Sequence, residues 1–257
     1  AFEGHFDDAI LKAYDQLPGP ILKFDESNYW SWKNDPQFQV PMFDHARILP
    51  FGKSSILKNK ERMMQFRMAA NLLEYYRNYH PDLSQVFDLD KTARYWALMD
   101  FGNVKHARLY RNHRYYYNPI TTKMEMIGFD LHAGADPNEN TYAEDVFGKG
   151  AKPRGYFLEY HLFNNEEFRE RYLFYLKKYS SEEFLSQLEE LFLPEMKLAE
   201  ELIQQEEPDY VFDFDYFRQH ATTIRNRLDE INTKWNQYRK EEADSARMIS
   251  PTEYEKI

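Results

Sequence analysis

Hydrophobic positions follow two different periods along the chain, and in the first third they predict a helix followed by a short strand. Residues 3–16 carry apolar side chains at helical spacing, and the Pro-Gly-Pro sequence at 18–20 ends that helix. The apolar run at 21–25 predicts a strand. Residues 26–58 have no steady period, so they predict loops with short helices.

Two further helices are predicted in the middle of the chain. The first covers residues 60–79 and stops before Pro81, because the residue before a proline disfavours helical geometry. The second ends at Phe101, with Asp88 or Asp90 as its N-terminal cap. The side chains expected to face the core are Met64, Met68, Leu72, Tyr75 and Tyr79 on the first helix and Ala93, Trp96 and Ala97 on the second.

The helical period then gives way to two extended runs. They cover Arg114 to Tyr117 and Met124 to Asp130, and the sequence NPITTK between them has turn chemistry. We therefore expect a β-hairpin. Residues 133–155 are rich in Gly, Asp, Asn and Pro and predict a long loop, which in compact domains is often functional.

The last third of the chain is predicted to be helical. One helix begins at Asn164, and the Ser-Ser-Glu-Glu sequence at 180–183 fits a capping box for the next, which Pro194 is expected to kink or split. Residues 1–236 would then form one α+β domain with far more helix than strand, followed by a polar tail at 237–257. The apolar stripe of the final long helix is Phe217, Ile224, Leu228, Ile231 and Trp235.

Composition narrows the function classes. Asp and Glu outnumber Lys and Arg by 43 to 33, which argues against a general nucleic-acid binder, because phosphate neutralisation needs clustered cations. The 257 residues include no cysteine, which excludes disulfides and thiolate metal sites. No apolar run approaches the roughly 18 residues of a membrane span. The Glu and Lys runs in 177–207 are typical of solvated helix faces.

Three polar residues around the hairpin are candidates for chemistry. Asp100 lies near a predicted helix C-terminus, where the macrodipole disfavours a carboxylate, so it needs a compensating partner. Asn112 precedes the first strand and Asp130 ends the second, so both can be directed at one cation. Magnesium prefers such oxygen ligands, and protein kinases use an Asp, an Asn and a second Asp in this order.

Spacing alone does not decide between this site and ordinary solvated polar residues. The motifs HRD-x-x-x-x-N, G-x-G-x-x-G and V-A-I-K of common protein kinases are absent. His106, His113 and His132 surround the candidate residues and leave a metallohydrolase open. Their spacing matches no recognised zinc motif and is more typical of surface or supporting histidines.

The stretch RNHRYYYNPITTKMEMIGFD resembles the signature of the CotH kinase family, in which an Asn and an aromatic strand precede N/D-P-x-T-x-K-L-x-P-I-x-[WF]-D. Weaker resemblances extend to FEGHFDDAILK near the start, to the ALMD run ending at Asp100 and to residues 162–191. The residues in register with the signature are Asn112, Tyr115 to Tyr117, Asn118, Pro119, Thr121, Lys123, Ile127, Phe129 and Asp130.

The resemblance implies a fold like the helical lobe of a protein kinase, with a metal-bearing hairpin. It implies transfer of phosphate from ATP, with Mg²⁺, to a Ser or Thr hydroxyl of a protein substrate. Asp100 would be the catalytic base or would orient the hydroxyl, and Asn112 and Asp130 would hold the magnesium ion. Glu3 would match the helix glutamate that holds the phosphate-binding lysine in kinase-like folds.

The chain also departs from the family pattern. The strands and nucleotide-binding lysine that the family places before Glu3 are absent from the sequence, which suggests a piece of a longer protein; Lys23 is then the candidate for the phosphates. His132 stands where the family often has an acidic residue or glycine, and Arg111 replaces a histidine. A non-catalytic binding or scaffold domain of the same fold is therefore the second interpretation. The compartment stays open among the bacterial envelope, the spore coat and secretion.

Overall fold

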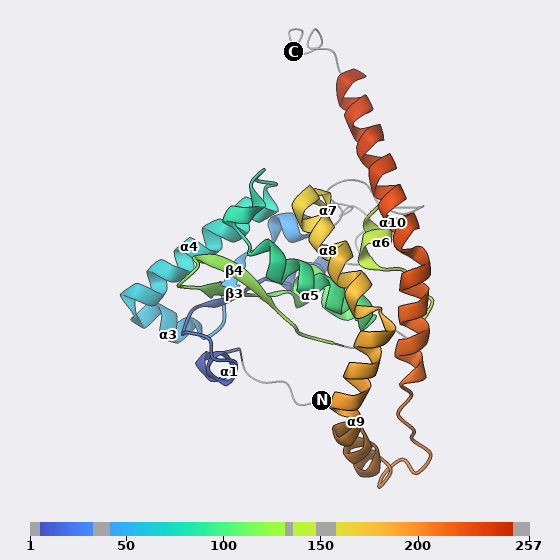
Figure 1. Cartoon of the computed structure of the whole chain (residues 1–257). Coiled ribbons are helices and arrows are strands. Elements are labelled where there is room, and N and C mark those ends of the chain that lie inside the picture. The colour runs from blue at the N-terminus through green and yellow to red at the C-terminus, as the bar shows by residue number, and fades with distance from the viewer. Residues whose placement is uncertain (1–5, 33–41, 132–135, 148–157, 249–257) are drawn as a thin grey trace.

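The computed structural model describes residues 6–32, 42–131, 136–147 and 158–248, with side chains described as far as residue 240. Within this part the chain has ten α-helices and one four-stranded antiparallel sheet, which confirms the predicted α+β class (Figure 1). No helix of the described part is long and apolar enough to cross a membrane.

The sheet has the strand order β2-β1-β3-β4, and neighbouring strands are antiparallel. The strands are β1 (Ile21–Phe24), β2 (Ile48–Pro50), β3 (Arg114–Asn118) and β4 (Lys123–Ile127). The predicted hairpin is confirmed, with Arg114 opposite Ile127 and Asn118 opposite Lys123. The sequence did not predict β2, because three residues are too few to show a period of two.

Alternation along the strands gives the sheet two different faces. On one face Leu22 and Tyr115 join the main core, whereas on the other Ile21 and Tyr116 pack with Leu11 of α1 (Asp8–Ala13). The helix α1 is shorter than the predicted one. The small second cluster packs it against the sheet.

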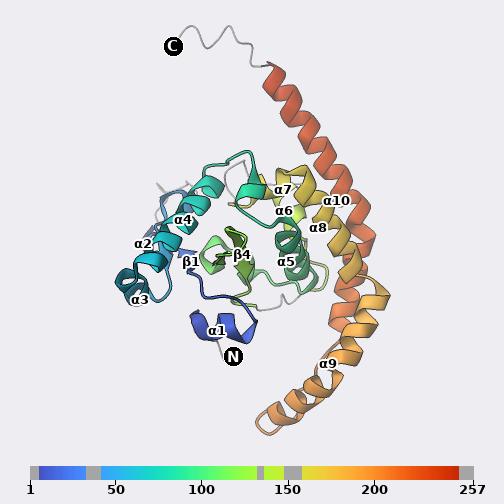
Figure 2. The ribbon, with the colours of Figure 1, turned by 60° about the vertical axis from the view of Figure 1, so that its left-hand side comes forward.

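Helices surround the sheet on both sides. Figure 2 shows the strands in the centre, with α2 (Ser27–Trp32), α3 (Lys53–Lys58) and α4 (Lys60–Arg77) on one side. On the other side lie α5 (Leu89–Phe101) and α8 (Glu166–Tyr179). The remaining helices are α6 (Tyr142–Phe147), α7 (Tyr160–Asn164), α9 (Glu182–Ile203) and α10 (Asp215–Met248).

Predicted caps define the starts of two helices. The Asp88 carboxylate accepts from the backbone N–H groups of Asp90 and Lys91, both at 3.1 Å, and starts α5. The Ser181 hydroxyl accepts from the N–H of Phe184 at 3.2 Å and starts α9. Both bonds satisfy donors that a helix cannot satisfy internally.

Trp96 of α5 is the centre of the main core, as its predicted core-facing position implies. It is fully buried, and its ring lies 4.7 Å from that of Tyr142 and 5.6 Å from that of Phe163, centroid to centroid. Ile224, Ile231 and Trp235 of α10 are also buried, which confirms that stripe.

The most buried side of α4 is shifted from the predicted one, although the predicted Leu72 and Tyr79 still pack half-buried against the main core. Ala69, Leu73 and Tyr76 are buried, whereas Met64 and Met68 are 59% and 43% exposed. Each buried residue comes one position after a predicted one, so α4 is rotated about its own axis by one residue relative to the prediction. This rotation brings the small Ala69 inside and leaves the flexible methionines at the edge.

Other predictions in the second half were wrong in detail. The loop expected for 133–155 contains α6, and α9 continues through Pro194, so of the two predicted effects of this proline, a kink or a split, the split is wrong. A proline removes only one helical hydrogen bond, which the rest of a 22-residue helix tolerates.

The boundary predicted at residue 236 lies inside α10. The Tyr160 hydroxyl donates to the Tyr238 hydroxyl at 2.7 Å, and the Tyr238 ring lies 5.1 Å from that of Phe147. Packing therefore continues past residue 236, because these aromatic contacts hold the helix to the body.

Buried tyrosines make the fold sensitive to alkaline pH. Burial raises the pKa of Tyr116 to about 12 and that of Tyr115 and Tyr142 further. Unfolded tyrosines ionise near pH 10, so the unfolded state releases protons first and stability falls as pH rises above about 10. We expect tertiary circular dichroism to be lost together with a late rise in tyrosinate absorbance. A single titration of all tyrosines near pH 10, with unchanged dichroism, would contradict this expectation.

Candidate functional site

Asn112 and Asp130 meet at the open end of the hairpin, as the sequence predicts. The Asn112 side-chain amide donates to Oδ2 of Asp130 at 2.7 Å and to the carbonyl of His106 at 2.8 Å. Asn112 ends a short 3-10 helix, Tyr110–Asn112, two residues before β3, and Asp130 follows β4 by three residues. The pairing of the two strands therefore brings these side chains together.

Asp130 adopts a left-handed backbone conformation, with φ of 56°. Few residues other than glycine take this conformation, although Asp and Asn tolerate it better than most. Such positions are frequent at binding and catalytic sites, where the surrounding structure maintains the strain. The conformation is consistent with a functional carboxylate at the end of β4.

His106 is a third member of this cluster. Its Nδ1 lies 3.0 Å from Oδ2 of Asp130, and its side chain is 62% exposed. Because an ionised carboxylate only accepts, this nitrogen carries the proton. In the sequence His106 is one of three neighbouring histidines, and its spacing does not distinguish it from the other two.

The second of the three histidines, His113, belongs to a different group of contacts. His113 is fully buried, with Nδ1 3.0 Å from both the Tyr115 hydroxyl and Oε1 of Glu159. It belongs to the core beneath the hairpin. His132 lies outside the described residues.

Asp100 is enclosed within the protein and has no exposed surface. Its Oδ1 accepts from the backbone N–H of Tyr142 at 2.8 Å and lies 2.7 Å from the Arg108 guanidinium. Its Oδ2 accepts from the Tyr172 hydroxyl, and burial together with this carboxylate raises the pKa of Tyr172. The predicted compensating partner is therefore Arg108.

Arg108, Tyr142 and Tyr172 enclose the Asp100 carboxylate in the core. A general base has to reach the substrate proton within hydrogen-bond distance. The contacts described for Asp100 lead to Arg108, Tyr142 and Tyr172, and none joins it to Asn112 or Asp130. Of the three candidates, the structure brings two together and places the third in the core.

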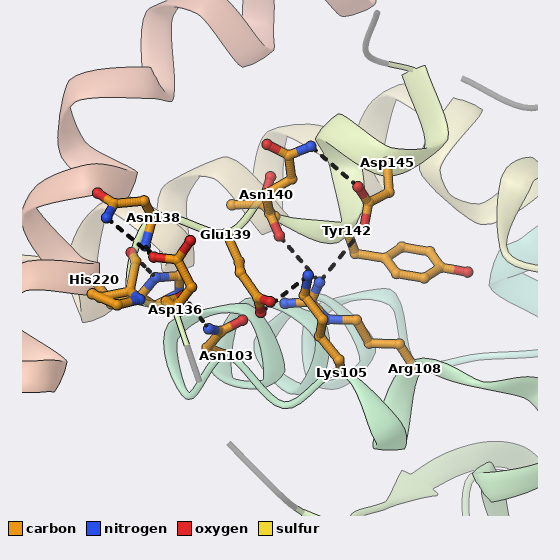
Figure 3. Close-up of polar contacts among 12 residues, drawn as sticks. Asn103, Lys105, Arg108, Asp136, Asn138, Glu139, Asn140, Tyr142, Asp145 and His220 are labelled. Carbon is orange, nitrogen blue, oxygen red and sulfur yellow. Dashed lines mark hydrogen bonds and ion pairs between the residues drawn. The ribbon is translucent and has the colours of Figure 1, made fainter. Parts of the chain in front are cut away.

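The segment at 136–140, which follows the hairpin, is fastened to the end of α5 and to α10 (Figure 3). Asn103, Arg108 and His220 each donate to one of its backbone carbonyls, at 3.0, 3.2 and 2.8 Å. Lys105 also lies 3.0 Å from the Glu139 carboxylate. These contacts connect the chain downstream of Asp130 to the residues that follow α5 and to α10.

Lys23 lies on the same face of the sheet as Arg114, whose guanidinium contacts the residue next to Asp130. Its Nζ is 3.3 Å from Oε1 of Glu26 and 5.9 Å from the ring centroid of Phe51. The Arg114 guanidinium lies 5.3 Å from the same ring and 3.9 Å from that of Phe129, the neighbour of Asp130. Glu3, the other predicted nucleotide-site residue, lies outside the described residues.

Arg111 adds a second cation next to Asn112. Its guanidinium lies 4.3 Å from the ring centroid of Tyr29 and 5.8 Å from that of Trp30. Sequence reasoning noted Arg111 only as a departure from the family pattern, because stacking on a distant helix leaves no local signal.

The described residues contain no group of three or more His, Asp or Glu side chains arranged to hold a metal ion. A cation at Asn112 and Asp130 would take its remaining ligands from phosphate and water, which is usual for magnesium. No family model matches the chain, and no curated protein matches it. The resemblance to CotH kinases therefore rests on the signature residues alone.

Proposed function

We propose that this protein binds a magnesium–nucleotide complex at Asn112 and Asp130 and transfers the terminal phosphoryl group to a Ser or Thr hydroxyl of a protein. The observation that carries the proposal is the 2.7 Å contact that joins these two side chains across the open end of the hairpin. It supports the proposal because it brings together two side chains at positions that match the kinase signature. The amide nitrogen makes this contact, so the Asn112 oxygen would bind the cation after the amide turns.

The residues have separate roles in this proposal. Asp130 and Asn112 would hold magnesium, which would stabilise the charge of the phosphates. In this proposal the phosphate oxygens are bound by Lys23 of β1, which is paired with Glu26, and by Arg111, which precedes Asn112 in the chain. The acceptor hydroxyl forms the new P–O bond as the bond to the leaving ADP oxygen breaks, and its proton passes to water. Phosphoryl transfer depends mainly on positioning and electrostatics, so it does not require a carboxylate base at Asp100.

A second candidate is a non-catalytic domain that binds a nucleotide without turnover. The enclosure of Asp100 favours it, because Asp130 is then the one carboxylate that the described contacts place in the cluster. Because His113 is buried, no specific observation on the described residues favours a metallohydrolase.

Replacing Lys23 by methionine tests the site, because the change removes the charge and keeps most of the side-chain volume. Loss of one charge-assisted hydrogen bond, about 1.5–3 kcal/mol, should weaken the binding of magnesium–ATP by roughly 10- to 100-fold in titration calorimetry. Lys12→Met, at an exposed position of α1, is the matched control and should bind as the wild type does.

Wild-type titrations with and without magnesium, and transfer of labelled phosphate to Ser/Thr peptides, complete the test. Magnesium-dependent binding with transfer supports the kinase. Binding without transfer identifies the non-catalytic domain, and no magnesium-dependent binding at all overturns the site.

A further inference from the structure

From its middle at Leu191 to its C-terminal end, α9 carries large apolar side chains that the described structure leaves uncovered. Leu191, Leu198 and Leu202 are 66%, 57% and 57% exposed. Figures 1 and 2 both show this end of the helix extending beyond the body formed by α5 and α8. The exposed large apolar residues on this part of the helix are Leu191, Phe192, Leu193, Leu198, Leu202 and Ile203.

The rest of the protein packs against a different part of α9. In its first half, Leu185 is buried with Phe101 and Ala221. In its second half, Glu200 accepts from the N–H of Phe212 at 3.3 Å, and Gln204 donates to the carbonyl of Tyr210 at 2.7 Å. These polar contacts hold the returning loop against one side of the helix and leave the leucines outside.

The exposed leucines form one face with an acidic surround. Leu191, Leu198 and Leu202 are spaced i, i+7 and i+11, which places them on one side of a helix. Glu195, at i+4, lies in the middle of the same face. Residues 189–209 contain eight acidic side chains and one lysine.

We propose that this leucine face of α9 binds a cationic amphipathic helix of a partner protein. An amphipathic helix would lay its apolar side on the leucines. Its Lys or Arg residues would meet the acidic surround, and one of them would pair with Glu195, since a carboxylate covered without a partner is costly.

Charge argues against the two other occupants. In a symmetric dimer the same patch meets itself, so the acidic surround would face its own copy. An anionic membrane surface would also repel the acidic surround, because such surfaces attract basic segments. The proposed surface does not depend on phosphoryl transfer at the hairpin.

The test uses a fluorescent helical peptide of about 18 residues, long enough to form a helix, made of leucine and lysine at helical spacing. A counterpart has glutamate in place of lysine. Fluorescence anisotropy should show that the lysine peptide binds the wild-type chain at least about tenfold more tightly than the glutamate peptide. Glu195→Lys and Leu198→Gln should each weaken binding of the lysine peptide by about tenfold or more.

Matched controls lie on α8, where Glu170→Lys and Phe174→Gln make the same chemical changes at exposed positions. They should leave binding within about twofold of the wild type. Equal weakening by Glu170→Lys would show general charge attraction and would overturn the proposal. Two other results would also overturn the proposal. A dimer in sedimentation that Leu198→Gln disperses would identify a second copy as the occupant, and lipid-vesicle binding that Leu198→Gln removes would identify a membrane.

Discussion

Replacing Asp100 by alanine is expected to lower the free energy of unfolding by about 3–5 kcal/mol, because the buried Arg108 guanidinium loses its nearest anion and keeps only Asp145, at 3.9 Å. The change also strands the N–H of Tyr142 and the hydroxyl of Tyr172, both of which donate to this carboxylate. Urea denaturation followed by circular dichroism measures the loss. Asp8→Ala, which breaks the exposed pair with Arg62, is the control and should cost less than about 1 kcal/mol.

A second variant keeps this test decisive if the alanine variant does not fold. Asp100→Asn retains an acceptor for Tyr142, removes the charge and places an amide N–H against the Tyr172 hydroxyl, which can accept, so it should lose less stability than the alanine variant. Full stability of Asp100→Asn combined with loss of phosphoryl transfer would return Asp100 to the catalytic role that the sequence suggests.

Replacing Asp130 by asparagine is expected to weaken the binding of magnesium–nucleotide by roughly 100-fold or more, the equivalent of about 3 kcal/mol for a lost charged ligand. The free energy of unfolding should change by less than about 1 kcal/mol. Asparagine tolerates the left-handed backbone at this position, and its carbonyl oxygen can still accept from Asn112 and His106. Titration calorimetry measures the affinity, and thermal unfolding measures the stability.

Asp136→Asn is the matched control, because it removes an exposed carboxylate from the segment after the hairpin without touching the cluster. It should bind the nucleotide complex as the wild type does. A variant at Asp130 that loses stability but keeps its affinity would assign this carboxylate a structural role and remove the metal site.

The features predicted correctly from the sequence are those decided by local chemistry. The hairpin, the Asp88 cap and the Ser181 cap each depend on a few neighbouring residues whose hydrogen bonds form within the same segment. The contact between Asn112 and Asp130 was predictable for the same reason, since a short hairpin connects them.

The features predicted wrongly depend on distant parts of the chain. The apolar residues of α4 cover neighbouring sides of the helix, so its pattern does not determine whether Met68 or Ala69 faces the sheet. The need of Asp100 for a partner was readable from its place near a helix end. The partners Arg108 and Tyr172 were not, because they come from a short 3-10 helix, His106–Arg108, and from a helix about 70 residues away.

The pairing of β3 with β4 also determines which changes in chain length the candidate site can survive. Because Arg114 lies opposite Ile127, Asn112 and Asp130 sit at fixed offsets beyond the paired strands. Residues added to the turn after Asn118 lie at the far end of the hairpin and leave those offsets unchanged. One residue added between Asn112 and Arg114, or between Ile127 and Asp130, would displace one side chain from the other. Among natural variants of this chain, length differences compatible with an intact site therefore belong in the turn.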